Sequence, residues 1–322
     1  MDLSGEPWQA SVQEAFKQVV TSGDGAVRGA PFSTASAGGI LYNKPAYAGL
    51  GLTIPKPGLN SWPTTEAILK DGTATPVIQT YGNSWTSQLI VLSDFYNVRA
   101  ANPEFPAQYT AGTAKFATDP GALRSFEKLQ EVYDAGMLNK DYAAASYDEG
   151  LRMLANGEGV HFPITSGALQ AISVNYPDKL QDVGFFPTPG DNADSNGLTA
   201  RMPQAVYIAN TSANVEAAKK FVAFVASPAG CAALNRVSGG SGPYLVQGCE
   251  LYNPPAAVTD MLPFFASNKV SPALEFLSPI KGPAPEQITV SVGSGIMSAV
   301  EGAKLYDEDV RKQAQQLGIA GW

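Results

Sequence analysis

Apolar positions in the middle of the chain follow a helical period and then form short runs, which predicts a helix followed by strands. Leu151 and Leu154 lie on one face of a helix that ends before Gly157, where a left-handed glycine cap fits. The apolar run 160–162 is typical of a short buried strand, and the run 183–186 of a second one. The order helix, strand, helix, strand indicates an α/β unit.

Polar residues follow two of the predicted strands. Thr165-Ser166-Gly167 turns the end of the first strand toward solvent, and Tyr81 to Trp85 lies between the predicted strand 75–81 and a helix that begins near Leu89. Ligands bind at the carboxyl ends of strands in open α/β sheets. An aromatic ring covers the C–H face of a sugar, while amides and hydroxyls bond its OH groups. The alternative for Trp85 is a core position beneath the helix.

Further amphipathic helices are predicted from apolar stripes. The best-marked one begins with Asp119 as N-cap and Pro120 at the first helical position. A last helix is expected to start at Asp307 and Asp309. The stripes, in chain order, are Trp8, Val12, Phe16 and Val19; Leu89, Leu92 and Tyr96; Leu123, Phe126, Leu129 and Val132; Val215, Ala218, Phe221, Val222 and Val225; and Ile296, Met297, Val300 and Leu305.

Length and charge limit the possible functions of the chain. With 322 residues the chain is long enough for two domains and a large core. The net charge is −8, and there is no run of Lys or Arg, so nucleic acid and an anionic membrane are not expected partners. No apolar run approaches about 18 residues, so no transmembrane helix is predicted. A neutral solute suits this composition best.

The sequence shows no motif for several common kinds of catalysis. The single histidine, His161, falls in an apolar strand and is expected to be a core or pocket-floor residue rather than a catalyst. No Cys/His cluster has zinc spacing, no Gly-x-Ser-x-Gly elbow occurs, and the carboxylates are scattered. We therefore expect neither a cofactor nor a metal.

The two cysteines, Cys231 and Cys249, lie on either side of a Gly-rich loop. Such a pair suits a disulfide in an exported protein, and two unpaired thiols are the alternative. The residues after Met1 lack the basic start and the apolar stretch of a signal peptide.

Five short passages together resemble the extracellular (family 1) solute-binding proteins of carbohydrate ABC transporters. The passages are Tyr42-Asn43-Lys44, Asn156-Gly157 to His161, Ser166-Gly167-Ala168, Phe186-Pro187-Thr188-Pro189 and the strand, cap and helix over 205–228. The family's "Gly-x-Trp" loop lacks its tryptophan here, because Ala168 and Leu169 stand in its place.

The resemblance implies a two-lobed α/β fold of the periplasmic-binding-protein type (type II-like, maltose-binding-protein-like), with hinge crossings and a truncated first lobe. We expect 1–37 to be the remnant of lobe 1 and 38–197 to form lobe 2. Residues 198–245 would return to lobe 1, and 246–322 would be a C-terminal helical segment, mainly in lobe 2. By comparison with the family, the chain would lack roughly 100 N-terminal residues, which would hold the export signal and the first βαβ units of the first lobe.

The implied function is delivery of a neutral sugar or oligosaccharide to the membrane permease by hinge closure, without catalysis. The protein would be a monomer outside the cell or in the periplasm, anchored as a lipoprotein in its full-length form. The expected ligand contacts are Ser36, Tyr81, Asn83, Trp85, Ser166, Gly167 and Arg236. For Arg236, a charge at a helix C-terminus is the alternative.

Two other functions remain open from the sequence. A carbohydrate-active α/β enzyme of the glycoside hydrolase type would need two carboxylates about 5–9.5 Å apart in a pocket. A truncated, non-binding fragment would expose a large apolar face on lobe 1.

Residues 57–65 also depart from the family, whose members open a helix there. Pro57, Gly58 and Pro63 oppose that helix, and we hypothesise a compensated frameshift, with a family-specific loop as the alternative.

Overall fold

The computed structural model describes residues 1–54, 63–192, 196–237 and 239–322. Residues 55–62 lie outside the described part, and with them most of the stretch assigned to the frameshift hypothesis. Helix α3 (Pro63–Asp71) follows directly, so Pro63 begins a helix, where proline is tolerated because the first turn needs no N–H donor.

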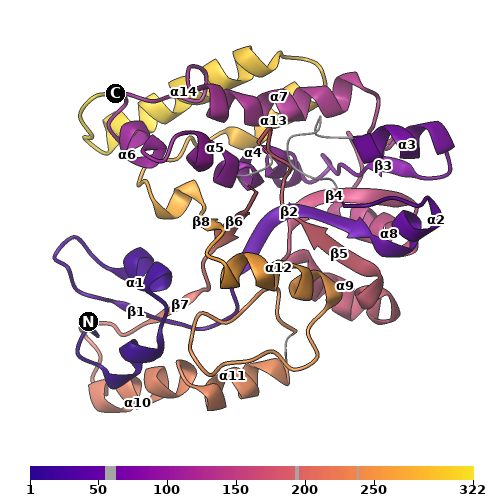
Figure 1. Ribbon diagram of the computed structural model, residues 1–322. Coiled ribbons are helices and arrows are strands. Elements are labelled where there is room, and N and C mark those ends of the chain that lie inside the picture. The colour runs from indigo at the N-terminus through magenta and orange to yellow at the C-terminus, as the bar shows by residue number, and fades with distance from the viewer. Residues whose placement is uncertain (55–62, 193–195, 238) are drawn as a thin grey trace.

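A large body and a small body make up the molecule (Figure 1). The small body is built from segments that are far apart in the sequence, since its strands β1 and β7 pair antiparallel. Its core combines Phe16 and Val20 with Ile208, Val222 and Leu245. Its elements are the 3₁₀ helix η1 (Pro7–Ser11), α1 (Glu14–Val20), β1 (Gly29–Pro31), β7 (Ala205–Tyr207), α10 (Val215–Val225) and α11 (Pro228–Asn235).

The large body contains a mixed sheet in the order β3-β4-β2-β6-β8, with β5 also paired to β2. Strand β2 is antiparallel to β4, β5 and β6, whereas β3 is parallel to β4 and β8 to β6. The strands are β2 (Ser36–Asn43), β3 (Thr75–Val77), β4 (Gly159–Thr165), β5 (Val183–Phe186), β6 (Leu198–Arg201) and β8 (Val270–Pro272).

Two layers of helices cover this sheet (Figure 1), because successive side chains of a strand point to opposite faces. Ile40 and Tyr42 of β2 enter one core, and Leu41 enters the other. The first core includes residues of α5 (Phe95–Ala101), α6 (Phe105–Thr110), α7 (Pro120–Asp134), α13 (Pro285–Gly293) and α14 (Ala299–Gln316). The second includes residues of α8 (Tyr147–Asn156), α9 (Ala168–Asn175) and α12 (Ala256–Ala266).

Shorter helices complete the large body. Helix α2 (Lys44–Gly49) continues directly from β2, and α4 (Leu89–Ser93) is separated from α5 only by Asp94. The remaining 3₁₀ helices are η2 (Ser84–Thr86), η3 (Pro177–Asp182) and η4 (Leu274–Phe276). Among the described residues no single helix is long and apolar enough to cross a membrane; by length and composition the bent pair α10 and α11 passes such a test together.

Local signals in the sequence set several element ends as expected. The Asp119 side chain accepts the N–H of Ala122 at the start of α7. Helix α8 has a capping box between Ser146 and Glu149, and it ends at Gly157 with φ of 75°. A left-handed φ of this kind favours glycine, which confirms the predicted cap.

One helical stripe was predicted on the wrong face. Ile296, Val300 and Leu305 are 78%, 40% and 43% exposed, because α14 buries Gly302, Ala303 and Tyr306 instead. Small residues let α14 approach α13 and α7 closely. A search for stripes of large apolar residues does not detect a contact of this kind. The helix also begins after Ser298, in a capping box with Glu301, rather than at Asp307.

Three other element predictions need correction. The N-terminal stripe is split between η1 and α1, and Val20 is buried rather than Val19. The stripe from Leu89 to Tyr96 is likewise broken at Asp94, between α4 and α5. Strand β3 ends at Val77, whereas the sequence predicted a strand to Tyr81.

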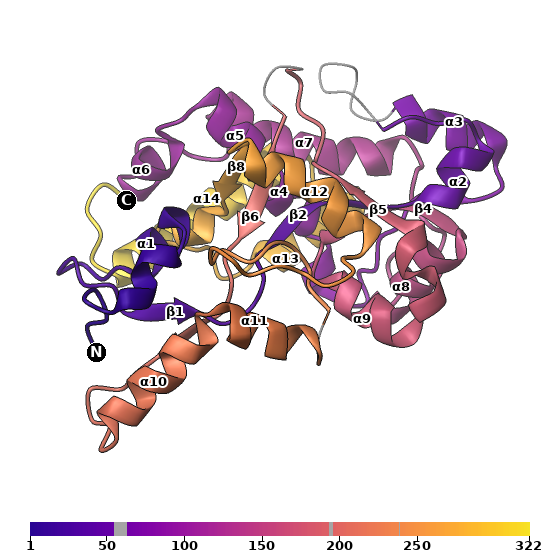
Figure 2. The ribbon, with the colours of Figure 1, turned by 60° about the horizontal axis from the view of Figure 1, so that its bottom comes forward.

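The small body exposes an apolar face. Phe221, predicted on the buried side of α10, is 57% exposed, and Phe224 and Tyr207 are 48% and 60% exposed. The sheet beneath consists of β1 and β7 alone. Figure 2 shows α10 projecting at the edge of the molecule.

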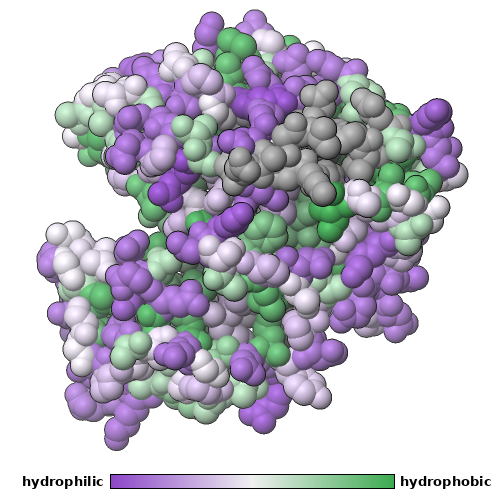
Figure 3. Space-filling view, viewed as in Figure 1, coloured by the Kyte–Doolittle hydropathy of each residue, from purple (hydrophilic) through white to green (hydrophobic). Residues whose placement is uncertain are grey.

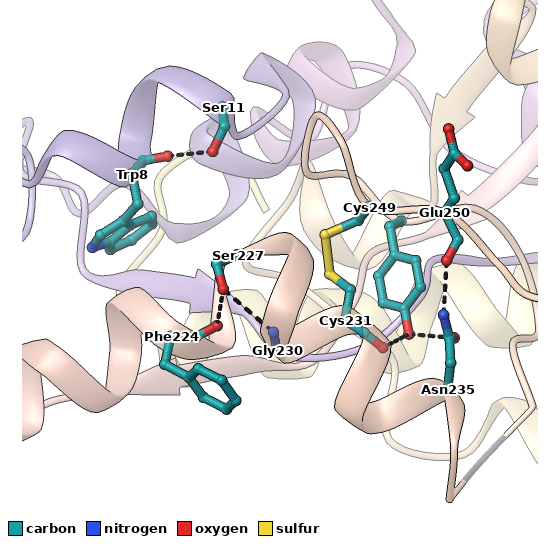
Figure 4. The surroundings of a disulfide bond; sticks show 10 residues. Trp8, Ser11, Phe224, Ser227, Gly230, Cys231, Asn235, Cys249 and Glu250 are labelled. Carbon is teal, nitrogen blue, oxygen red and sulfur yellow. Dashed lines mark hydrogen bonds between the residues drawn. A yellow bond between two sulfur atoms is a disulfide. The ribbon is translucent and has the colours of Figure 1, made fainter.

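The predicted disulfide between Cys231 and Cys249 is present, with a Cα–Cα distance of 5.8 Å (Figure 4). It ties α11 to the segment that returns toward the large body. Beside it, the Tyr244 hydroxyl donates to the Asn235 side chain at 2.8 Å, and Asn235 donates to the Glu250 carbonyl at 2.7 Å.

Replacing both cysteines by serine should lower the free energy of unfolding by roughly 2–3 kcal/mol, because the bond closes a loop between positions 18 apart. Chemical unfolding of the oxidised protein and of the double variant measures this difference. Equal midpoints with equal slopes would show that the bond does not stabilise the fold.

Candidate functional site

A cavity of about 150 Å³ lies on the large body where the chain passes to the small one. Gly38 of β2, Thr165 of β4 and Arg201 of β6 line it, and these residues lie near the ends of their strands. Leu89 and Leu92 of α4 contribute apolar walls. Figure 3 shows a notch in the surface between the two bodies.

Positively and negatively charged side chains line the cavity. Arg201 and Glu275 form an ion pair at 2.8 Å, with side chains 40% and 25% exposed. Gln88 and Lys281 also line it. A guanidinium presents several donors in one plane and a carboxylate accepts several bonds, so the pair can bind neighbouring hydroxyls while its own charges cancel.

The predicted contact Ser36 lies next to this cavity. It is partly exposed and is the Cα partner of Arg201 in the β2–β6 ladder. Trp85 is three residues before Gln88, is partly buried, and packs against Tyr147 with ring centroids 5.1 Å apart.

The turn that carries Trp85 is fixed to α13. The Ser84 hydroxyl donates to Glu286 Oε2 at 2.6 Å, and the Ser87 hydroxyl lies 2.7 Å from that of Thr289. The exposed Asn83 uses its side-chain oxygen to accept the N–H of Tyr147 at 2.7 Å. The turn is therefore held rigidly against two helices.

Two predicted contacts are buried. Tyr81 is only 6% exposed, packs edge-on against Tyr142, and has a hydroxyl with no hydrogen-bond partner among the described residues. Burial raises the pKa of Tyr81 above its usual value. Ser166 is fully buried, and its hydroxyl bonds only to the protein backbone. The expectation that residues 165–167 turn into solvent is thus wrong for Ser166, whereas Gly167 is partly exposed.

Arg236 lies apart from the cavity lined by Arg201. It is exposed at the end of α11, in a groove with Asn235, Glu250 and Tyr252 near the disulfide. The two regions share no lining residue.

His161 is a core residue, as predicted. Its Nδ1 donates to the Pro76 carbonyl at 2.9 Å, which leaves Nε2 to accept the Tyr47 hydroxyl at 2.6 Å. Burial lowers the pKa of His161 to about 4. Among the described residues no group of three or more His, Cys, Asp or Glu side chains is placed to hold a metal ion.

Sequence reasoning missed Gln88, Arg201, Glu275 and Lys281. Arg201 and Glu275 meet because β6 and β8 pair in parallel, which places Ala200 beside Pro272. No local motif marks either residue. Of these four residues, only Gln88 could have been predicted from the sequence, because it lies three positions after Trp85.

The fold is the two-lobed periplasmic-binding-protein fold. A chitin oligosaccharide binding protein superimposes with a TM-score of 0.78 at 17% identity, over 98% of this chain and 79% of that one. RafE, a solute-binding protein solved in complex with raffinose, gives 0.76 at 20% identity, over 98% and 80%.

This chain belongs to the family of bacterial extracellular solute-binding proteins, whose model matches residues 3–230. A multiple sugar-binding protein of Streptococcus mutans serotype c is 27% identical over 200 residues, which are 60% of this chain and 46% of the relative. The chain thus matches about half of that relative's length.

The family consists of solute-binding proteins rather than enzymes. Among the described residues that line the cavity, Glu275 is the only carboxylate. The family description also places its members outside the cytoplasm, where a disulfide such as Cys231–Cys249 persists.

Proposed function

We propose that the protein binds a neutral saccharide between its lobes and presents it to the permease of an ABC importer. The observation that carries this proposal is the Arg201–Glu275 pair in a cavity beside Gln88 and Thr165, at the place where the lobes join. Its hydrogen-bonding groups suit hydroxyls, and its internal charge balance does not require a charged ligand.

The names of similar proteins support a saccharide, because they include raffinose, chitin oligosaccharide and multiple-sugar binding. A ligand that touches both lobes favours the closed arrangement, since only differential contacts shift the equilibrium between open and closed states. The closed form is then the one that the permease recognises. We also propose that the full-length protein is a lipoprotein held at the outer side of the membrane.

We propose a division into lobes that differs from the expected one at one boundary. Residues 1–37 and the return segment up to 245 would form the first lobe, with that segment starting after Arg201 rather than at 198. The reason is that β6 pairs with β2 inside the large sheet. Residues 246–322 supply β8 and the helices α12 to α14 to the second lobe.

Thermal unfolding with a panel of raffinose, stachyose, chitin oligosaccharides and simple sugars tests the proposal. A ligand that binds only the folded state raises the midpoint as its concentration increases. Amino acids and uronic acids serve as comparison solutes. A shift with neutral saccharides alone supports the proposal, and the absence of any saccharide shift overturns it for this chain.

Replacing Arg201 by alanine should weaken saccharide binding about 10- to 100-fold, because hydrogen bonds from charged groups contribute about 1.5–3 kcal/mol each. The change also leaves Glu275 without its partner. Calorimetric titration measures the affinity. Arg152→Ala is the matched control, because Arg152 also pairs with a glutamate, Glu158, but far from the cavity in α8. Equal losses in both variants would contradict a direct role of Arg201.

A further inference from the structure

We infer that Ser166 is a positioning residue that holds the chain crossings between the lobes in one hydrogen-bonded arrangement. Its side chain is completely buried in this arrangement of the lobes. The hydroxyl accepts the N–H of Ala37 at 2.9 Å and donates to the carbonyl of Ser241 at 2.5 Å. The Ser166 N–H also donates to the Ala37 carbonyl at 2.8 Å. One side chain thus joins the end of β4 to two separate crossings.

These two crossings, residues 34–37 and 241–243, also bond to each other. The Ala35 N–H donates to the Pro243 carbonyl at 2.8 Å, and the Ser241 N–H donates to the Thr34 hydroxyl at 3.1 Å. Their close approach depends on Gly242, since a Cβ at that position would lie 2.4 Å from the Ala35 carbonyl oxygen. The crossings therefore form a compact unit that Ser166 attaches to the large lobe.

The place of Ser166 in the chain makes this unit relevant to binding. Thr165, its neighbour, lines the cavity, and Gly167 on the other side is partly exposed. The turn is joined to the crossing at Ala37 through the N–H and the hydroxyl of Ser166, and to the crossing at Ser241 through the hydroxyl. Without that hydroxyl, a buried N–H and a buried carbonyl lose a partner, which favours local separation of the crossings. The inference rests on the proposed function only where it treats the crossings as a hinge for ligand closure.

Hydrogen exchange of the ligand-free protein tests the inference with Ser166→Ala. Exchange in peptides that cover 34–38 and 240–243 should be about tenfold faster than in the wild type, which corresponds to about 1.4 kcal/mol of local opening. Exchange in α7 should stay the same. Ser125→Ala is the matched control, because Ser125 is also completely buried but donates only within α7, to the Ala122 carbonyl at 2.6 Å.

A second variant should disturb the same two crossings without changing Ser166. Gly242→Ala places a methyl group against the Ala35 carbonyl, so it should open the same two peptides. Ser166→Cys keeps the shape with a weaker donor and should give an intermediate effect, and it replaces Ser166→Ala if that variant does not fold.

The inference is overturned if the crossings exchange at the wild-type rate in the Ser166 variants, or if exchange rises uniformly as in a global destabilisation. Because the protein is free of ligand, these results do not depend on saccharide binding. A wild-type protein that binds no saccharide contradicts the proposed function, whereas unchanged crossings contradict the role of Ser166.

Discussion

Lys128→Met should destabilise the protein by about 3–5 kcal/mol, the largest effect expected of a single substitution here. Lys128 and Asp94 are each 1% exposed, and Lys128 Nζ lies 2.7 Å and 2.9 Å from the two Asp94 carboxylate oxygens. It also donates to the Pro189 carbonyl at 2.8 Å. Burial raises the pKa of the Asp94 carboxyl, so without Lys128 this group loses the partner that keeps it charged.

Chemical unfolding of four variants, Lys128→Met, Asp94→Asn, their combination and Lys179→Met, measures the effect. Lys179→Met is the matched control, because Lys179 pairs with Asp182 at the surface, where such pairs contribute about 0–1 kcal/mol. The double variant Lys128→Met with Asp94→Asn should be more stable than the sum of the single changes, since the remaining charge is removed. A single-variant loss no greater than that of Lys179→Met would show that the pair is not needed for folding.

The second large effect is a pH dependence from His161. Burial lowers its pKa to about 4 in the folded protein, whereas the ordinary value is 6.5. Above pH 6.5 both folded and unfolded states hold the neutral ring, and His161 contributes no pH dependence. As the pH falls from 6.5 to 4, only the unfolded state gains a proton, so stability decreases, by about 3 kcal/mol in total.

His161 is the single histidine of the chain, so its ring proton signals in NMR report this titration without overlap. The midpoint should lie near pH 4, and stability should increase with pH between 4 and 6.5. In His161→Asn that slope should be flatter. A midpoint near 6.5 would mean that the ring is accessible to water in the folded protein.

Sequence patterns were reliable where one short segment determines its own structure. The Asp119 cap, the Gly157 cap and the buried His161 depend on neighbours within a few residues or on one apolar strand. The patterns failed where a distant segment decides the outcome. Phe221 was expected to be buried because helix α10 is amphipathic, but nothing in the helix shows whether another element covers that face.

The candidate site shows the same limit. The Trp85 turn was found because the aromatic and polar residues are consecutive. Arg201 and Glu275 were not found, since they meet only after β6 and β8 pair. Ser166 was recognised as part of an important turn, but its burial depends on Ser241, which is 75 positions later. Contacts of this kind come from tertiary packing, which short-range patterns do not encode.

The way the chain crosses between the lobes also affects how it folds during synthesis. The small lobe joins β1, near the N-terminus, to β7, and its core extends to Val246. The large sheet receives β8 at residues 270–272, and its first core needs Val310 and Ala314 of the last helix. The large lobe therefore cannot be completed until the last helix has been made, whereas the buried core of the small lobe needs the chain only as far as Val246, so the two lobes become able to fold at different times during synthesis.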